Sequence, residues 1–296
     1  MNLEVKHTTR YRYSAPVSRS QHLVHLSPRG ADTSRTRRQP DTWQRLHHHQ
    51  LGVTPVPALR RDTTDSFGNA IIMLDIETAH TEFVLEAYSR VETQRRQAIN
   101  LAATTPWDQQ RDWPPFDLDV IQFGCASPLT RASAEIADYA RTSFAAGRPV
   151  LEGGMDLVLR IFQEFKFDPA ATDVATPTAQ AFQLRRGVCQ DFSHVALSCL
   201  RALRIPCRYV SGYLLTRPPP GQPKLQGADA SHAWISIWAP ETGWVDFDPT
   251  NGLIVQDEHV TIAYGRDYAD VSPVSGVLIG GGAHTVSVSV DVGEIK

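Results

Sequence analysis

Residues Arg185–His194 read RRGVCQDFSH, which combines a glycine, a cysteine and the start of an amphipathic pattern. From about Gln190 to Arg204 the apolar residues recur at the spacing of a helix with one buried face. Pro206 ends that pattern. The spacing therefore predicts a buried helix with Cys189 at its N-terminus. There the unpaired backbone N–H groups and the helix dipole favour negative charge, and thus the nucleophilic thiolate.

Cys189 also has a simpler interpretation. Free cysteine is among the most buried residue types and often acts only as a small apolar side chain. The stretch around Cys189 does not decide between a nucleophile and a core residue, so the decision depends on sequence further along the chain.

A strand–turn–strand pattern follows downstream, with the turn at Pro240–Gly243. Alternation gives each arm two distinct faces. The apolar face carries Ala233, Ile235 and Ile237 in the first arm and Val245 and Phe247 in the second; the other face carries His232, Trp234, Ser236 and Trp238, then Trp244, Asp246 and Asp248. The apolar faces must coincide in an antiparallel hairpin, because a slip of one residue would bury the charges. His232 and Asp248 are therefore predicted on one face of adjacent strands, either opposite or diagonal.

A cysteine at a helix start, a histidine and a carboxylate are the groups that cysteine-dependent acyl transfer requires. The imidazole takes the thiol proton, the carboxylate orients the ring, and the thiolate attacks an amide carbonyl. His232 alone could be an ordinary strand histidine, and Asp246 and Asp248 alone could form an acidic turn edge. Their shared face favours a catalytic triad, with the choice between the two carboxylates left open. A non-catalytic binding module that retains the fold is the alternative, although all three positions are filled here.

The first hundred residues have the pattern of an antiparallel β-rich unit. From Leu3 to Tyr13 apolar and polar residues alternate, which indicates a strand with one buried face. Shorter strands are predicted at Gln21–Leu26, Thr42–His49, Ala70–Ile76 and Thr81–Glu92. Short strands separated by turns are typical of a sandwich or partial barrel.

A composition shift marks the second half. Residues 94–122 form a linker rich in proline, tryptophan and aspartate. Helices are then predicted from the Ser127-Pro128 pair to Phe144, at Gly154–Glu164 and at Thr176–Gln183, and a strand at Cys207–Leu215.

Composition excludes several classes of function. With 296 residues and 42% hydrophobic residues the chain can bury a large core. A net charge of −3 argues against nucleic acid or an anionic membrane surface as the main partner. The N-terminus has no apolar segment of signal-peptide length, and the four cysteines lack metal-site or disulfide-scaffold spacing, so a reduced, cytoplasmic protein is expected. No calcium-binding loop pattern is visible, and no metal or cofactor is expected.

Three motifs resemble those of the bacterial transglutaminase-like superfamily, whose members are often described as cysteine proteases. They are GVCQDF (Gly187–Phe192), SHAW (Ser231–Trp234) and GWVDFDPTN (Gly243–Asn251). Leu3–Arg29 is similar to the β-rich N-terminal region that accompanies this family, and residues 265–282 are similar to its tail. The resemblance therefore spans nearly the whole chain.

The resemblance implies an α+β fold: an antiparallel β-sandwich-like domain over 1–95, a linker over 96–124, and a papain-like transglutaminase core over 125–296 with C-terminal strands, in which helices pack on an antiparallel sheet. It carries the nucleophile onto Cys189, the base onto His232 and the orienting carboxylate onto Asp248, and so selects Asp248 over Asp246.

Further site residues are expected around this triad. Gln183 is a candidate side-chain donor to an oxyanion, and Trp234 and Trp244 are candidate walls of the acyl pocket. Arg266 and Tyr268 would line the cleft by family resemblance alone. The expected substrate is a peptide or protein amide. Hydrolysis by a protease or amidase is favoured, with glutamine-to-amine cross-linking by a glutamyltransferase as the alternative.

Overall fold

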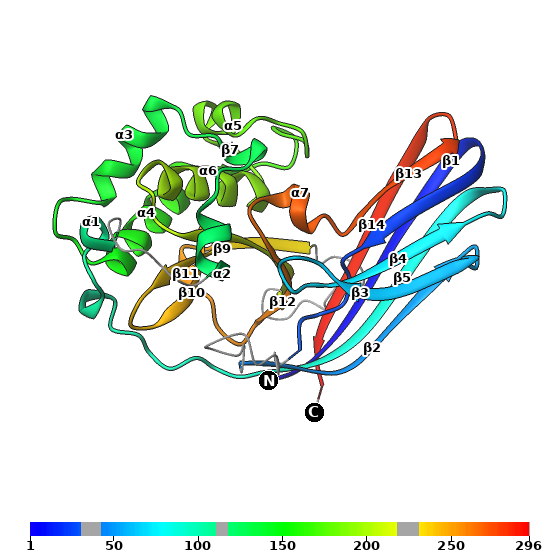
Figure 1. Ribbon diagram of the computed structural model, residues 1–296, viewed down its shortest axis with the longest axis horizontal. Helices are drawn as coiled ribbons and strands as arrows, with labels where there is room; N and C mark the ends of the chain where they lie inside the picture. Colours follow the sequence, from blue (N-terminus) through cyan, green and yellow to red (C-terminus); the bar gives the residue numbers. More distant parts are fainter. Residues whose placement is uncertain (31–42, 111–117, 218–230, 296) are drawn as a thin grey trace.

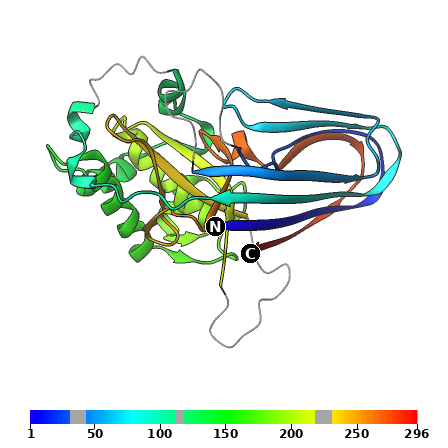
Figure 2. The ribbon, with the colours of Figure 1, turned by 90° about the horizontal axis from the view of Figure 1, so that it is seen from below.

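The computed structural model describes residues 1–30, 43–110, 118–217 and 231–295. Figures 1 and 2 show a curled sheet at one end of the molecule, a helical layer at the other and a second sheet between them. This architecture is the predicted α+β fold, with a β-rich first unit followed by a core of helices on an antiparallel sheet.

The curled sheet is built around one long strand, β1 (Asn2–Val24). The first half of β1 pairs with β5 (His80–Thr93) and β14 (His284–Glu294), and the second half with β4 (Ala70–Ile76) and β13 (Val274–Gly280). The outer strands are β2 (Gln44–Thr54) on β5 and β3 (Leu59–Thr64) on β4. Every pairing is antiparallel, and the strands bend over at the end farthest from the helices (Figure 1).

The two C-terminal strands correct the expected division of the chain. The sequence assigned residues 125–296 to one core, but β13 and β14 pair with β1 in the first sheet. An alternating strand pattern indicates a buried face but not the partner strand, so the return of the chain to its first unit has no local signal.

The second sheet has the strand order β11-β10-β9-β8-β12. Its strands are β8 (Cys207–Leu214), β9 (Ser231–Ala239), β10 (Gly243–Asp248), β11 (Leu253–Ile254) and β12 (His259–Gly265). The main helices are α3 (Ala134–Ser143), α4 (Val150–Glu164), α5 (Thr178–Leu184) and α6 (Cys189–Ala202). Helix α6 is buried along most of its length and shares one apolar cluster with β8 and β9. The bounds of α6 are close to the predicted ones, about Gln190 to Arg204.

Short elements complete the chain. They are η1 (Leu101–Ala103), α1 (Trp107–Gln110), α2 (Leu118–Gly124), η2 (Pro128–Thr130), the paired strands β6 (Lys166–Phe167) and β7 (Arg186–Gly187), and α7 (Tyr268–Val271). The predicted linker thus contains helical turns, and within it Trp107 packs edge-on against Phe144. Trp113 lies outside the described residues.

Two predicted helix starts differ from the structure. Ser127 and Pro128 do open a helical turn, the 3₁₀ helix η2, but this turn does not continue into the first α-helix. The first helix begins at Ala134, where the Ser133 side chain accepts a hydrogen bond from the backbone N–H of Ile136. The second, α4, begins at Val150 and runs through Gly153 and Gly154. A Cβ on Gly154 would lie 2.5 Å from Cδ1 of Ile237, so the glycine permits close helix–sheet packing there instead of marking a helix end.

The hairpin of β9 and β10 has the predicted register, with Val245 opposite Ile237 and Phe247 opposite Ile235. The polar face of the hairpin is buried as well, since Asp246 and Asp248 are 1% and 0% exposed, so avoiding buried charge does not by itself explain the register. None of the helices in the described ranges is long and apolar enough to cross a membrane.

Candidate active site

Cys189 is the first residue of α6, as predicted, and a tight turn holds it there. Gly187 has φ +155°, and a Cβ on it would lie 2.3 Å from Oδ2 of Asp191. That oxygen accepts hydrogen bonds from the backbone N–H of Val188 (2.8 Å) and from the hydroxyl of Thr172 (2.7 Å). The buried Asp191 carboxylate therefore caps the helix and fixes the backbone on either side of the cysteine. The neighbouring Gln190 side chain donates to the carbonyl of Val174.

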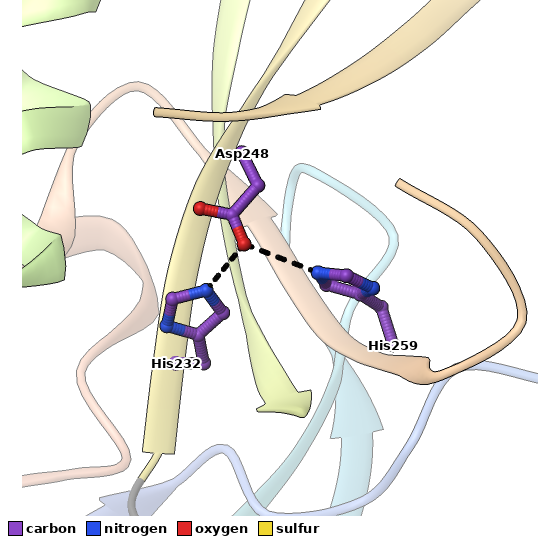
Figure 3. Close-up of side chains that lie close together, drawn as sticks. All are labelled: His232, Asp248 and His259. Atoms are coloured by element: carbon purple, nitrogen blue, oxygen red, sulfur yellow. Dashed lines mark hydrogen bonds and ion pairs between the residues drawn. The ribbon is translucent and has the colours of Figure 1, made fainter. Parts of the chain in front are cut away.

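His232 and Asp248 meet across the hairpin. His232 Nε2 lies 2.7 Å from Asp248 Oδ2, and Figure 3 shows the ring pointing at the carboxylate. Since Phe247 pairs with Ile235, the next pair along this register places Asp248 opposite Trp234 and diagonal to His232. The bond through Nε2 leaves Nδ1 as the second ring nitrogen of His232.

The Asp248 carboxylate is surrounded by donors. Oδ1 accepts from the backbone N–H groups of Thr250 (2.9 Å) and Asn251 (3.1 Å). Oδ2 accepts from the Asn251 side chain (2.7 Å) and lies 3.2 Å from Nε2 of His259, in addition to His232. Such a set favours the ionised form of a buried carboxylate. Burial raises the pKa of Asp248, but the charges and hydrogen bonds of His232 and His259 outweigh it and hold that pKa well below its usual range.

The protonation of His232 follows from the same contacts. Burial lowers the pKa of His232, but the hydrogen bond and charge of Asp248, together with a hydrogen bond and charge from Cys189, raise it to about 10. The ring is therefore favoured as an imidazolium between a carboxylate and a sulfur. His232 thus contacts Asp248, and Cys189 influences its pKa. The catalytic roles of the three residues stay predictions.

The remaining cysteines differ from Cys189, which is half-buried. Cys199 and Cys207 are buried, and burial raises the pKa of their thiols to about 12 and about 11. Cys125 is exposed on the surface. Neither buried thiol is suited to be a nucleophile near neutral pH.

The two tryptophans share one apolar cluster but have different neighbours. Trp234 is fully buried, with its ring 6.0 Å from that of His232 and 5.2 Å from that of His259. Trp244 packs against Phe123, and the Arg208 guanidinium lies over its ring. Trp234 thus lies beside both histidines, and Trp244 packs at the border of the same apolar cluster. Their role as walls of the acyl pocket stays a prediction.

The other predicted residues lie around α5 and α7. Gln183 is exposed on α5. Arg266 forms an ion pair with Asp270, and the Tyr268 backbone N–H donates to His194 Nε2. His194 is buried, and burial lowers its pKa to about 4, so it is a neutral acceptor for the Tyr268 N–H. The oxyanion role of Gln183 and the cleft role of Arg266 and Tyr268 stay predictions.

Sequence reasoning missed His259, which joins Asp248 at the start of β12. Every residue of β12 is buried, so the strand has no alternation that would single out one side chain. The three groups His232, Asp248 and His259 offer ligand atoms within 4.8 Å of one another, near enough to consider a metal ion. However, both Nε2 atoms face the same carboxylate oxygen at hydrogen-bond distance, and metal binding would require them to exchange that oxygen's bonds for metal bonds. The contacts describe a hydrogen-bonded network.

The cysteine on a buried helix, beside a histidine–carboxylate pair on an antiparallel sheet, defines the papain-like class of folds. Two family models match this chain. The model of the bacterial transglutaminase-like N-terminal region matches residues 3–92, and the model of the transglutaminase-like superfamily matches residues 136–249. The chain belongs to the transglutaminase-like superfamily.

Two mycobacterial relatives match this chain over nearly its whole length, and a third relative matches part of it. An uncharacterized protein of Mycobacterium tuberculosis is 33% identical, over 97% of this chain and 91% of that protein. An uncharacterized protein of Mycobacterium leprae is 30% identical, over 98% of both chains. A protein-glutamine gamma-glutamyltransferase of Pseudomonas aeruginosa is 34% identical over 131 residues, which is 40% of this chain and 20% of that protein. The crystal structure of a "Putative Cysteine Protease from Cytophaga hutchinsonii" has a TM-score of 0.74 at 22% identity, covering 100% of this chain and 91% of that one, and thus shares the fold.

Proposed function

We propose that this protein is a cysteine-dependent acyl-transfer enzyme that cleaves amide bonds through a thioester. The observation that carries the proposal is the 2.7 Å contact of His232 with Asp248, in a site where Cys189 helps to raise the pKa of His232. Cys189 is the nucleophile, His232 the general base and acid, and Asp248 the carboxylate that orients the ring. These roles match the chemistry that each group can perform in this geometry.

The first half of the reaction forms the thioester. The Cys189 thiol gives its proton to Nδ1 of His232, since Nε2 is held by Asp248. The thiolate attacks the amide carbonyl, and the negative oxygen of the tetrahedral intermediate is stabilised by the Cys189 backbone N–H at the start of α6; one such donor is commonly worth ~3 kcal/mol. The C–N bond then breaks, and the His232 imidazolium gives its proton to the departing amine.

The second half releases the acyl group. His232 accepts a proton from water, the resulting hydroxide attacks the thioester, and the Cys189 sulfur leaves and recovers its proton from the ring. If an amine attacks instead of water, the product is a new amide and the enzyme is a glutamyltransferase. Hydrolysis of peptide or protein amides is the activity we propose. Transfer is the second candidate, favoured by the Pseudomonas aeruginosa relative over 40% of this chain.

Thiol alkylation tests whether Cys189 and His232 form a thiolate–imidazolium ion pair, and it requires no knowledge of the substrate. In a Cys125→Ser background the only half-exposed thiol is Cys189, because Cys199 and Cys207 are buried. We expect iodoacetamide to modify Cys189 at about pH 6, where an ordinary thiol is protonated. His232→Ala should abolish this low-pH labelling. Labelling of Cys189 with the pH dependence of a free thiol in both proteins would favour a non-catalytic scaffold.

Mass spectrometry separates the two reactions. A glutamine-containing peptide is incubated with the wild type, with and without a primary amine, and with Cys189→Ala as the control. Deamidation or backbone cleavage without amine incorporation supports hydrolysis, and an amine adduct supports transfer. An amide substrate screen that gives equal product with the wild type and Cys189→Ala contradicts both.

A further inference from the structure

We propose that His259 is a fourth member of the active site, a positioning residue that holds the Asp248 carboxylate for His232. This inference rests on the proposed function and extends it to a residue outside the three superfamily motifs. His259 comes from β12, whereas His232 and Asp248 come from β9 and β10, so three strands of the sheet would build the site.

The geometry at Asp248 carries the inference. His232 and His259 approach the same oxygen, Oδ2, from two sides, at 2.7 Å and 3.2 Å (Figure 3). His259 is 3% exposed and Asp248 is fully buried, so water does not provide an easy substitute for this contact. A buried hydrogen bond to a charged group is stronger than an exposed one, and its loss leaves the carboxylate under-solvated.

The other side of the His259 ring has no competing contact. Within the described residues, Nδ1 of His259 is buried and has no hydrogen-bond partner. The hydrogen bond to the carboxylate is therefore made through Nε2–H, donated to Asp248. Asp248 is then the group toward which His259 is specifically directed. The edge of the His259 ring also meets the Trp234 ring at 5.2 Å, which restricts its rotation.

The N-terminal unit secures the strand that carries His259. Strand β12 is at the edge of its sheet, pairs with β8 on one side, and needs partners on the other. The Gln44 amide supplies them at Thr261, accepting from its N–H (2.7 Å) and donating to its carbonyl (2.8 Å). The Asn69 amide makes the equivalent pair at Tyr264: it accepts from the Tyr264 N–H (2.8 Å) and donates to the Tyr264 carbonyl (2.7 Å). Two side chains of the first unit thus replace a neighbouring strand, which gives that unit a part in fixing the active site.

The test compares variants that differ in their reach toward Asp248. In His259→Gln the side-chain amide can occupy the place of Nε2 and still donate, whereas in His259→Asn it is too short and in His259→Leu there is no donor. The probe is the rate of iodoacetamide labelling of Cys189 as a function of pH in the Cys125→Ser background, with kcat and KM where an amide substrate has been found. We expect His259→Leu and His259→Asn to lose about tenfold in labelling at about pH 6, and His259→Gln to stay near the parent.

Controls separate positioning from folding and from the proposed function. His22→Leu removes another buried histidine, one that stacks on Phe83 in the curled sheet, and should leave the labelling profile unchanged. If His259→Leu does not fold, the contrast between Gln and Asn decides. Equal profiles for those two variants overturn the role of His259.

Two further variants show which idea has failed. His232→Ala and Asp248→Asn are measured in the same series. If neither changes the labelling profile, the triad itself fails and the proposed function with it. If both change it while His259→Asn and His259→Leu behave as the parent, the triad stands and only the assignment of His259 is overturned.

Discussion

At the scale of single residues, the site depends on a charge held out of water. A buried ion is costly unless hydrogen bonds and an opposite charge compensate. Asp248 receives donors from two backbone N–H groups, an amide and two imidazoles. The carboxylate therefore stays ionised without solvent, and it can hold His232 as an imidazolium beside Cys189.

The first prediction follows from that charge. Asp248→Asn preserves the shape of the side chain but removes the charge that raises the pKa of His232, so burial should lower that pKa and neutralise the ring near pH 7. Labelling of Cys189 at about pH 6 should nearly disappear, and kcat/KM should fall by about a hundredfold or more.

Asp246→Asn is the matched control for that change. Asp246 is on the same face and equally buried, but its carboxylate bonds to Arg96 at 2.8 Å. Its substitution should reduce stability and leave the labelling profile unaltered. The opposite pattern would transfer the orienting role to Asp246.

The second prediction concerns stability against pH. The pKa of His232 is raised from its ordinary value near 6.5 to about 10, so its contribution to the free energy of unfolding is complete below about pH 6.5 and is lost as the pH rises to about 10. The pKa of Asp248 is lowered, so its contribution is present above about pH 4 and is lost at lower pH.

Urea unfolding of the wild type and His232→Gln at several pH values measures the first contribution. The difference between the two proteins should be largest between about pH 4 and pH 6.5 and should shrink steadily toward pH 10. A difference that grows as the pH rises above 7 would mean that His232 is neutral in the folded protein.

At the scale of elements, the cysteine helix and the histidine hairpin could be predicted because each has a strong periodic pattern. Helix α6 and the faces of β9 and β10 follow from residue spacing alone. The features that the sequence did not predict depend on contacts between distant segments. His259 lies in a strand buried on both faces, and β14 pairs with β1. Gly154 is a glycine within a helix because Ile237 packs too close to leave room for a Cβ. Local pattern carries no information on such contacts.

The third prediction tests the packing beneath the histidines. Gly212 in β8 is opposite His232, and a Cβ on it would lie 2.1 Å from the Val260 carbonyl oxygen and 2.4 Å from the Trp234 ring. Gly212→Ala must therefore separate β8 from β12 or move Trp234. We expect a loss of about 3 kcal/mol in the free energy of unfolding.

Low-pH labelling of Cys189 should also weaken in Gly212→Ala, because Trp234 supports both imidazoles. Gly52→Ala is the control, since the nearest atom to its Cβ would be 3.7 Å away. Equal stability of the two variants would show that the Trp234 ring and β12 yield without cost.

At the scale of the whole molecule, the two units share one interior. Leu3, Val5 and Val91 of the curled sheet belong to the same apolar cluster as Phe192 of α6 and Ile235 of β9. The Arg96 guanidinium lies over Trp43 and bonds to the buried Asp246 of the second sheet. The chain also returns through β14 to pair with β1. The N-terminal unit is therefore part of the folded core, and we expect the protein to unfold in one transition.

The last prediction tests this coupling through Gln44. In Gln44→Leu the Thr261 N–H loses its buried acceptor, and such an unsatisfied group costs about 1–3 kcal/mol. The Thr261 carbonyl keeps the Arg29 backbone N–H as a donor, at 3.0 Å. Gln21→Leu is the control, because Gln21 is exposed in the same curled sheet and its amide donates to the Asp75 carboxylate, away from β12. Chemical denaturation followed by far-UV circular dichroism and by tryptophan fluorescence should give one lowered midpoint for Gln44→Leu, identical for both probes.

Because β12 carries His259, the fraction of Cys189 labelled at about pH 6 should fall as well. Two separate transitions, with labelling retained after the first, would instead show that the curled sheet can detach without disturbing the site.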